Sequence, residues 1–466
     1  MSSPSPSPCG APERQSQSCA SSPEGDRPPA PLHADVLSWG RYPRVEHRQI
    51  CKPAWNDRIP EIFNAAQPGG LLPFGRGRSY GDSCLNAGRG LVQCGRLNRI
   101  LGFDESTGVV RCESGVALCD LIDVFLPKGW FLPVTPGTSF VTVGGAIAND
   151  VHGKNHHCAG TFGDHVHQIA LHRSDKGLIF CSSRENSEML RATIGGLGLT
   201  GIIAWADVHL KRVPGPWIES ESIPFRSLKT FLDLSHDSNE LFEYTVAWID
   251  CFAGRNVRGI FFRGNHAKIH KKFRPKRGPM VPFELPTWIL NRYSVQAFNA
   301  AFYAVHLARK RRTVEGYDSF FYPLDAIRHW NLLYGRQGFL QHQCVIPETK
   351  LEAFEELLDL VARSGMGSFL VVLKQFGTAP PAGMLSFPRP GLTITFDFAM
   401  RGERTLELMQ SLDDIVQKSG GAIYPAKDAR MSPAMFETSF PSWHSFVPHM
   451  DPKISSSFWR RVTRSS

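Results

Sequence analysis

This chain of 466 residues lacks several features that mark common classes of protein. It has no run of about 18 apolar residues, so no transmembrane helix is predicted. Its 11 cysteines are odd in number, scattered and never spaced CxxC. That pattern argues against a disulfide framework or a zinc ribbon and indicates a reducing compartment. No P-loop, HExxH motif or internal repeat occurs.

What the chain does contain is enough apolar material to fold. Apolar residues make up 42% of it, and its length predicts two or three domains. The first 33 residues are an exception, because they are rich in Ser, Pro and Gln and lack the apolar stretch of a signal peptide. We predict a disordered leader over residues 1–33, or a start codon assigned upstream of the true one.

From residue 34 onward the pattern predicts mixed helices and strands. Apolar residues at helical spacing predict helices over 116–126, 186–194, 351–364 and around 408–416, the last ending at Gly420. Strands are predicted over 91–94, 109–112, 202–210, 339–346, 368–376 and 392–398. The strand over 202–210 alternates cleanly and is expected to be half-buried, and Pro214 and Pro216 mark a domain junction.

Three of these strands predict a polar wall. Alternation over 392–398 puts Thr393, Thr395 and Asp397 on one face and four apolar residues on the other. Gln341 and Gln343 share a face of their strand, and Lys374 lies between Leu373 and Gln375. An antiparallel sheet packed on helices can present such residues to a substrate, although a solvated sheet face has the same alternation.

Two glycine-rich segments could bring backbone close to a ligand. Gly75–Gly88 reads GRGRSYGDSCLNAG, and its first glycines allow the close approach with which a loop holds a pyrophosphate. Thr135–His157 contains Pro136-Gly137 and Gly144-Gly145, with the titratable His152 and Lys154. Either could be an ordinary turn. A third segment, Ala192–Ile203, could equally be a tight helix-to-strand connection.

Two further alternatives concern chemistry. Histidines crowd the second segment at positions 152, 156, 157, 165 and 167, but glycine and asparagine disfavour a helix between the first two, so no metal is predicted. Near the C-terminus, Lys427 adjoins Asp428 within Ile423–Arg430. This is either a surface ion pair or, if burial lowers the lysine pKa, a catalytic base or substrate clamp.

Taken in order, these segments resemble the vanillyl-alcohol-oxidase type of FAD-linked oxidases, and within it the branch that oxidises polyprenylphosphoryl-ribose. The strings that carry the resemblance are GRSYGD (77–82), VTVGGAIANDVHGKNHH (141–157), GLTGII (198–203), GFLQHQCVIP (338–347) and YPAKDAR (424–430). It runs from about Trp39 to Arg461 and is weak over 251–312.

The resemblance implies an α+β fold: a two-part PCMH-type FAD-binding domain (34–215 and 422–466) and a substrate domain (216–421) built on an antiparallel sheet flanked by helices. It implies FAD contacts at Gly75, Arg76, Gly77, Arg78, Ser79, Tyr80, Gly137, Thr142, Val143, Gly144, Gly145, Asn149, His152, Ile203 and Tyr424. It implies substrate contacts at Tyr80, Lys154, Tyr322, Gln341, Gln343, Lys374, Thr395 and Asp397. Lys427 and His152 are the expected catalytic residues.

Two departures from the family pattern matter. Many relatives tether FAD through a histidine where this chain has Arg78, so FAD is expected to bind non-covalently. The mycobacterial-type oxidase has a cysteine where this chain has Thr395, which reshapes the pocket and removes a thiol from it.

The implied reaction is FAD-dependent oxidation of the 2-hydroxyl of a polyprenylphosphoryl-β-D-ribose to the 2-keto sugar, the first half of an epimerisation to arabinose for cell wall polysaccharide. The alternative is an aldonolactone or alditol oxidase acting on a soluble sugar. A nucleic-acid binder would explain the basic balance but not the five strings. A short-chain reductase is a possible partner, and the expected location is cytoplasmic, at the inner face of the membrane.

The positive charge of the chain is concentrated in one segment. The chain carries a net +9, but residues 251–312 hold 14 Lys and Arg and one acid, so the rest of the chain is slightly acidic. Aromatic residues are interleaved with these cations, at positions 261, 262, 273, 283, 288, 298 and 302. Such a mixture suits an anionic membrane surface, although a solvated loop is the alternative.

Overall fold

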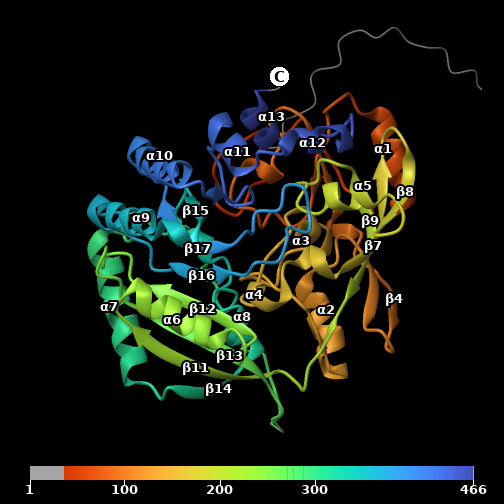
Figure 1. The fold of residues 1–466 in the computed structure, drawn as a ribbon. Coiled ribbons are helices and arrows are strands. Elements are labelled where there is room, and N and C mark those ends of the chain that lie inside the picture. Colours follow the sequence, from red (N-terminus) through yellow and green to blue (C-terminus); the bar gives the residue numbers. More distant parts are fainter. Residues whose placement is uncertain (1–35, 270, 276–277, 287, 465–466) are drawn as a thin grey trace, which may run out of the picture. The chain divides into compact units, whose positions relative to one another are not determined.

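The computed structural model describes residues 36–464 except 270, 276, 277 and 287, and these fold as one compact unit. The predicted leader therefore lies outside the described residues. Helices and antiparallel sheets alternate along the chain, which confirms the predicted α+β class (Figure 1). The predicted domain boundaries stay predictions.

A five-stranded antiparallel sheet forms the first layer. Its order is β4 (Ile100–Asp104), β5 (Val109–Glu113), β9 (Ile202–His209), β7 (Val166–Arg173) and β8 (Gly177–Ser182). The helices α2 (Leu118–Phe125), α3 (Val143–Ala148) and α5 (Ser187–Thr193) share its apolar core. The predicted helix over 116–126 is confirmed. Its final turn reaches Gly129, whose φ of 81° is easy only for glycine.

The strand predicted over 202–210 is confirmed, but its half-buried character is wrong. Both faces of β9 are largely buried. The reason is a long side chain from the neighbouring strand: Arg111 pairs with Asp207 at 2.7 Å and lies 3.9 Å above the Trp205 ring. A charged side chain thus covers the face that alternation assigned to solvent.

Smaller elements connect this layer to the rest. A parallel three-stranded sheet has the order β1 (Gln49–Cys51), β3 (Gly90–Gln93) and β2 (Pro73–Phe74). Strands β6 (Trp130–Phe131) and β10 (Lys211–Arg212) pair with each other. Short helices α1 (Ile59–Ala65) and α4 (His156–Ala159) complete this part.

An eight-stranded antiparallel sheet forms the second layer. Its order is β14 (Arg312–Gly316), β11 (Trp217–Phe225), β13 (Gly259–Ala267), β12 (Tyr244–Ile249), β16 (Val372–Phe376), β17 (Gly391–Ala399), β15 (Phe339–Ile346) and β18 (Ala422–Ile423). The predicted strand over 368–376 starts four residues later than expected. The Ser368 hydroxyl donates to Leu370 O and accepts from Asp397 N, so side-chain bonds replace the ladder there.

Helices cover one face of this sheet. The apolar residues of β17 pack in one core with α6 (Leu228–Ser238), α9 (Leu351–Ser364) and α10 (Glu403–Lys418). Helix α9 ends at Gly365, which is left-handed as predicted, and Gly420 beyond α10 is too. The register pairs Gln341 with Asp397 and Gln343 with Thr395, which confirms that these side chains share the opposite face.

The long helix α7 (Arg292–Ala308) lies on that opposite face, beside β12 and β13. The centre of its Phe302 ring lies 4.6 Å from that of the Trp248 ring, and the centre of its His306 ring lies 5.4 Å from that of the Phe262 ring. The short helix α8 (Tyr317–Phe321) follows β14. Figure 1 shows α7 at the edge of the sheet away from the five-stranded layer.

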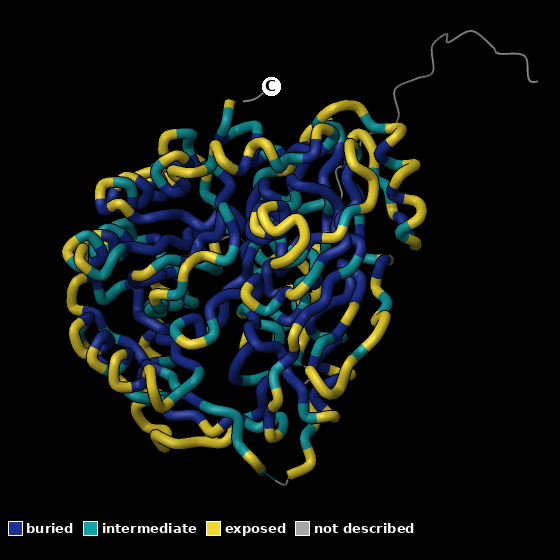
Figure 2. The backbone as a smooth tube through the Cα atoms, turned by 45° about the vertical axis from the view of Figure 1, so that its right-hand side comes forward, coloured by how far each residue is buried: buried dark blue, intermediate teal, exposed yellow. Residues whose placement is uncertain are grey.

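The C-terminal helices lie against the segment that follows β2. These are α11 (Pro433–Ser439), α12 (Trp443–Phe446) and α13 (Ser457–Thr463). On α13, Arg461 donates to Asp82 and to Asp428, at 2.7 and 2.9 Å. One arginine therefore ties together the two loops predicted to contact FAD and substrate. Figure 2 shows that buried backbone fills the interior of the molecule and that exposed backbone lies at its periphery.

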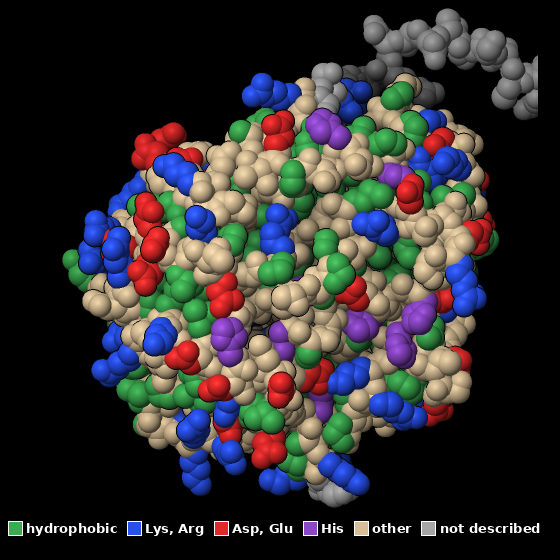
Figure 3. Space-filling model, viewed as in Figure 1, with side chains coloured by type: hydrophobic (Ala, Val, Ile, Leu, Met, Phe, Trp, Pro, Cys, Tyr) green, Lys and Arg blue, Asp and Glu red, His purple; other side chains and the backbone are tan. Residues whose placement is uncertain are grey.

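The structure corrects the interpretation of residues 251–312. Four of the 14 cations, at positions 255, 258, 263 and 312, form ion pairs with Asp359, Asp250 and Glu221. The aromatic residues do not form one surface either, because Phe261 is in the core whereas Phe283 and Trp288 are exposed. The other described cations of the segment, at positions 268, 271, 272, 274, 292 and 309–311, are exposed. Figure 3 shows Lys and Arg side chains gathered at the lower end of the molecule, over β11 and β14.

Candidate active site

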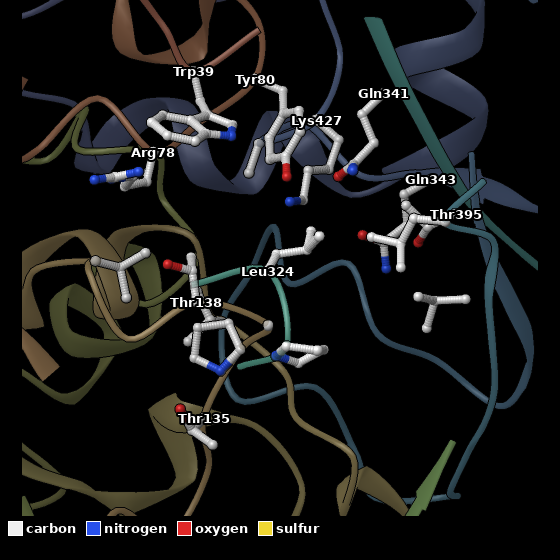
Figure 4. Close-up of a pocket in the computed structure, with 18 of the residues that line it drawn as sticks. Trp39, Arg78, Tyr80, Thr135, Thr138, Leu324, Gln341, Gln343, Thr395 and Lys427 are labelled. Carbon is white, nitrogen blue, oxygen red and sulfur yellow. The ribbon is translucent and has the colours of Figure 1, made fainter. Parts of the chain in front are cut away.

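A cavity of about 990 Å³ lies between the glycine-rich loops and the polar face of the eight-stranded sheet. Figure 4 shows Trp39 and Arg78 on one side, Gln343 and Thr395 on the other, and Tyr80 and Lys427 between them. Residues from both halves of the chain thus meet in one space. No cluster of three or more His, Cys, Asp or Glu side chains within the described residues is placed to hold a metal.

The first glycine-rich loop forms one end of the cavity. It follows β2, and every residue from Gly75 to Tyr80 lines the space. A Cβ at Gly75 would come within 2.7 Å of Thr142 Oγ1, so the loop must lie directly against the start of α3. Gly77 has a φ of 61°, which favours glycine at this turn.

The second glycine-rich segment supplies the facing wall. Thr142 caps α3 by accepting from Gly145 N at 3.1 Å, and Gly144 is pressed against Ser114, where a Cβ would come within 2.8 Å of the serine Cβ. Because Gly144 and Gly145 have no side chain, their backbone is open to the cavity. Tyr424 anchors the other end of α3, since its hydroxyl donates to Asn149 O at 2.8 Å.

Several buried polar atoms at this end have no partner among the described residues. They are Arg78 Nε, Ser83 Oγ and Ser114 Oγ, and all three residues line the cavity. Buried donors without partners are costly, so they indicate a polar ligand rather than empty space. The Arg78 guanidinium also lies 4.1 Å above the Trp39 ring, and burial lowers its pKa. Glycine-shaped walls and unpaired donors suit the phosphates and hydroxyls of a dinucleotide such as FAD.

Lys427 projects into the middle of the cavity. Its Nζ lies 3.8 Å from the centre of the Tyr80 ring, and burial lowers its pKa while the charge of Asp397 acts in the opposite direction. Asp397 itself is buried behind Gln341, whose Nε2 donates to its Oδ1 at 2.5 Å. Burial raises the Asp397 pKa. A lysine with a lowered pKa at a cavity centre can exchange a proton near neutral pH.

His152 lies between Lys374 and Gln343. Lys374 Nζ is 3.1 Å from His152 Nδ1, and Gln343 Nε2 is 2.9 Å from His152 Nε2. Burial, followed by the charge of Lys374, holds the His152 pKa well below its usual range, so the ring is neutral. A neutral imidazole has one donor and one acceptor, so it cannot accept from both neighbours.

Turning the Gln343 amide resolves this conflict. Amide oxygen and nitrogen are distinguished only by their hydrogen bonds. With oxygen at the position 2.9 Å from His152, Gln343 accepts from the ring N–H and also from the Thr393 hydroxyl 3.3 Å away. Lys374 then donates to Nδ1. This arrangement leaves the Gln343 amide nitrogen available to a ligand.

Two lysines give the cavity a positive field. Burial lowers the pKa of Lys374 to about 7 and that of Lys154 to about 8, and each lysine keeps an open side only towards the cavity. Neither forms an ion pair with a described carboxylate, and the nearest oxygens of the protein are backbone carbonyls of Gly153 and Phe320. The charge of Glu315, which also lines the cavity, acts on Lys154, whereas no carboxylate within the described residues does so on Lys374. Buried cations without an ion pair favour an anionic ligand.

All but three of the predicted site residues line the cavity. Val143 turns its side chain into the core, Tyr322 is buried and bonds Thr135 Oγ1 at 2.6 Å, and Asp397 lies behind Gln341. Their placement corrects the prediction of direct contact. Tyr322 and Asp397 instead support residues that do face the cavity, whereas the ligand contacts of the others stay predictions.

Several lining residues were not among the predicted contacts. Trp39, Thr138 and Leu324 point into the cavity (Figure 4). Trp39 precedes the first glycine loop by more than thirty positions and Leu324 follows α8, so no spacing within the motifs could reveal these two, whereas Thr138 lies within the second glycine-rich segment. The aromatic residues Phe298 and Phe302 of α7 are predicted from the sequence to face a membrane, whereas in the structure they line the cavity.

Known proteins share this arrangement. Residues 49–182 match a family model described as an FAD binding domain. Decaprenylphosphoryl-beta-D-ribose oxidase of Mycolicibacterium smegmatis is 34% identical over 446 residues, which covers 92% of this chain and 94% of that protein. This chain belongs to the same family of FAD-linked oxidases.

More distant members of the comparison match a smaller part. L-gulonolactone oxidase of Mus musculus is 31% identical over 200 residues, covering 42% of this chain and 44% of that protein. D-lactate dehydrogenase of Anaerostipes hadrus is 29% identical over 166 residues, or 34% of each chain. The resemblance drawn from the motifs is thus confirmed.

As an FAD-linked oxidase, the chain is an FAD-dependent oxidoreductase. The structure fits that cofactor on its own terms, because the glycine walls at residues 75 and 144 and the unpaired polar atoms of Arg78, Ser83 and Ser114 meet at one end of the cavity. The polar sheet face and the lysines line the other end of the same cavity.

Proposed function

We propose that this FAD-linked oxidase oxidises the 2-hydroxyl of a polyprenylphosphoryl-β-D-ribose to the 2-keto sugar. The observation that carries the proposal is the pair of lysines, Lys154 and Lys374, that share one cavity with the polar sheet face. Within the described part of the chain Lys374 has no carboxylate acting on it, and Lys154 has only the charge of Glu315, with which it forms no ion pair. A sugar phosphodiester offers one anion for the lysines and hydroxyls for the amides. The 34% identical relative is named for a substrate of this kind.

The residues of the chain would divide the reaction as follows. When bound, FAD accepts the hydride from the carbinol carbon. Lys427 takes the hydroxyl proton as a general base, which its lowered pKa permits at neutral pH. Neutral His152 orients the sugar, held by the bonds described above. Lys374 and Lys154 hold the phosphate, and the Gln341 and Gln343 amides hold the remaining hydroxyls.

FAD would be bound without a covalent link. The position where many relatives carry the linking histidine is Arg78, and a guanidinium does not form that bond. Acid precipitation of the yellow protein should therefore release all of the flavin into the supernatant. Flavin retained in the pellet would contradict this part of the proposal.

A soluble sugar or lactone is the competing substrate, because two lactone oxidases are among the more distant relatives. A neutral lactone would leave Lys374 and Lys154 without a partner, so the cavity favours the phosphodiester. The test is anaerobic mixing of holoenzyme with polyprenylphosphoryl-ribose, the matching arabinose compound, or gulonolactone. Bleaching of flavin absorbance by the ribose compound alone is expected, and bleaching by gulonolactone alone would overturn the proposal.

The proposed substrate also requires contact with a membrane. None of the helices in the described part of the chain combines the length and apolar character needed to span a bilayer. Cations at 268, 271, 272 and 274 lie outside the ion pairs of the described segment, and Phe283 and Trp288 are 62% and 73% exposed. We infer peripheral binding to an anionic surface at the inner face of the membrane, with about 1 kcal/mol from each near-surface cation.

Vesicles test this contact. Replacement of Lys271, Lys272 and Arg274 by Glu should abolish co-sedimentation with anionic vesicles while FAD stays bound. Replacement of the exposed Lys418, at the end of α10, by Glu is the matched control. Undiminished sedimentation of the triple variant would contradict membrane binding by this segment. A short-chain reductase that completes the epimerisation would then consume the keto sugar at the same surface.

A further inference from the structure

The cavity continues past the polar wall along the same face of the eight-stranded sheet. Gln341 and Gln343 of β15, Thr395 of β17 and Val372 of β16 line its polar part, and Val246 and Trp248 of β12 continue the lining. The strand register places all of these side chains on one face. Strand β13, which carries Phe262, is four positions from β15, so this extension reaches about 19 Å at the usual strand spacing.

The far part of the cavity is apolar. Its floor consists of Val246, Trp248 and Phe262, and helix α7 lies beside it with Val295, Phe298 and Phe302 facing the same space. Phe302 meets Trp248 at 4.6 Å and closes one side. We name this part, bounded by these six residues, the α7 compartment. A ligand there would meet mainly hydrocarbon and aromatic surface. Beyond it the lining becomes polar, with Ser220 and Ser222 of β11, Thr313 and Glu315 of β14, and His306 and Arg309 at the end of α7.

We propose that the α7 compartment binds the first isoprene units of the polyprenyl chain while the sugar and phosphate occupy the lysine-lined part of the same cavity. This inference rests on the proposed function and extends it, because it assigns the lipid part of the substrate to its own binding site. The two parts of the cavity match the sugar phosphate and the polyprenyl chain of the proposed substrate. Polar groups and lysines face the sugar phosphate, and the α7 compartment faces the chain.

The character of α7 indicates where the chain enters. The helix has no acidic residue, and besides the side chains in the cavity it exposes Tyr293, Val305 and Leu307, at 80%, 54% and 51%. A helix that is apolar on its outer side as well as its inner side is typical of a membrane interface. Arg309 follows at its end and also lines the cavity. The isoprenoid chain would therefore pass beside α7 from the lipid phase.

Chain length provides the measurement. Holoenzyme is mixed anaerobically with methylphosphoryl-, geranylphosphoryl- and farnesylphosphoryl-ribose, and kcat/KM is followed through flavin bleaching. Burial of only two of the five carbons of an isoprene unit already corresponds to more than tenfold, so a rise of at least roughly tenfold is predicted for each of the first units. The ratio of the farnesyl to the methyl value isolates the chain from any change in chemistry or FAD content.

Two variants place the chain in the structure. Phe302→Glu puts a charge into the α7 compartment, and Phe298→Glu does so at a residue that is 47% exposed and therefore more tolerant of substitution. Each should reduce the farnesyl-to-methyl ratio to near one. Leu241→Glu is the matched control, because it adds the same charge at an exposed apolar residue that lies outside the cavity and away from α7.

Each outcome is decisive. A ratio that stays high in both compartment variants, or that falls equally in Leu241→Glu, overturns the assignment of the chain to this compartment. A wild-type ratio of one with both esters oxidised also overturns it, yet leaves the proposed function intact. If no ribose ester bleaches the flavin, the proposed function itself fails and the compartment loses its ligand.

Discussion

Lys374 offers the sharpest test of the anionic substrate. Its Nζ is held 3.1 Å from His152 Nδ1 and 3.4 Å from Gly153 O, and no described carboxylate pairs with it. The side chain is thus placed in advance, with its charge directed at the cavity. Replacing it with Met removes both the charge and the donor, whereas replacing it with Gln keeps a donor for His152 and removes only the charge.

The expected loss follows from the type of bond. A hydrogen bond to a charged group contributes about 1.5–3 kcal/mol, which is a roughly 10- to 150-fold loss in kcat/KM. The upper part of this range is expected at a pH below the pKa of Lys374, where the buried side chain carries its full charge. Since burial lowers its pKa to about 7, phosphate binding should weaken as the pH rises through this region. Bound phosphate opposes the loss of the proton and moves that decline to higher pH.

The assay compares a phosphorylated and a neutral substrate in both variants. Flavin bleaching is measured with methylphosphoryl-ribose and with methyl riboside, at saturating FAD. Both variants should lose the preference for the phosphodiester, and only Lys374→Met should also disturb the neutral substrate through His152. An equal loss for both substrates in Lys374→Gln would refute the phosphate assignment and leave Lys374 as a support for His152 alone.

The other predictions concern the proton, the cofactor and the fold. Lys427→Ala should keep FAD bound but slow flavin reduction by about 10²- to 10⁴-fold; rapid bleaching in this variant would remove Lys427 as the base. Asp397→Asn removes the charge that raises the Lys427 pKa, so the rising limb of the pH–rate profile should move to lower pH, and a shift to higher pH would contradict the coupling. Gly144→Val should lose flavin absorbance without loss of circular dichroism, because its side chain would collide with Ser114, whereas Gly102→Ala, with open space around its Cβ, should retain flavin. Arg461→Met leaves the buried carboxylates of Asp82 and Asp428 without their partner and should lower the free energy of unfolding by about 3–5 kcal/mol, as measured by urea titration.

Local patterns predicted much of this site, and the reason is physical. Alternation along β15 and β17 determines which side chains share a face, and an antiparallel neighbour cannot change that assignment. The glycines at 75 and 144 were evident because close packing of backbone demands them. Asp397 shows the limit: its face was right, but its contact was not, since only the packed structure puts Gln341 between it and the cavity.

Long-range partners decide what the basic segment means. A count of charges treats Arg263 and Arg312 like the lysines at 271 and 272, yet both arginines pair with Glu221 on β11. The cations that can attract an anionic surface are therefore those of the loop after β13 and of the turn after α7, because ion pairs neutralise the others. The aromatic residues divide in the same way: Phe262 and Phe302 face the cavity, and Phe283 and Trp288 face outward. In the proposals made above, this stretch of sequence would bind a membrane through its outer residues and the chain of the substrate through its inner ones. Composition alone cannot indicate either role, because it does not say which side chains face the cavity and which face outward.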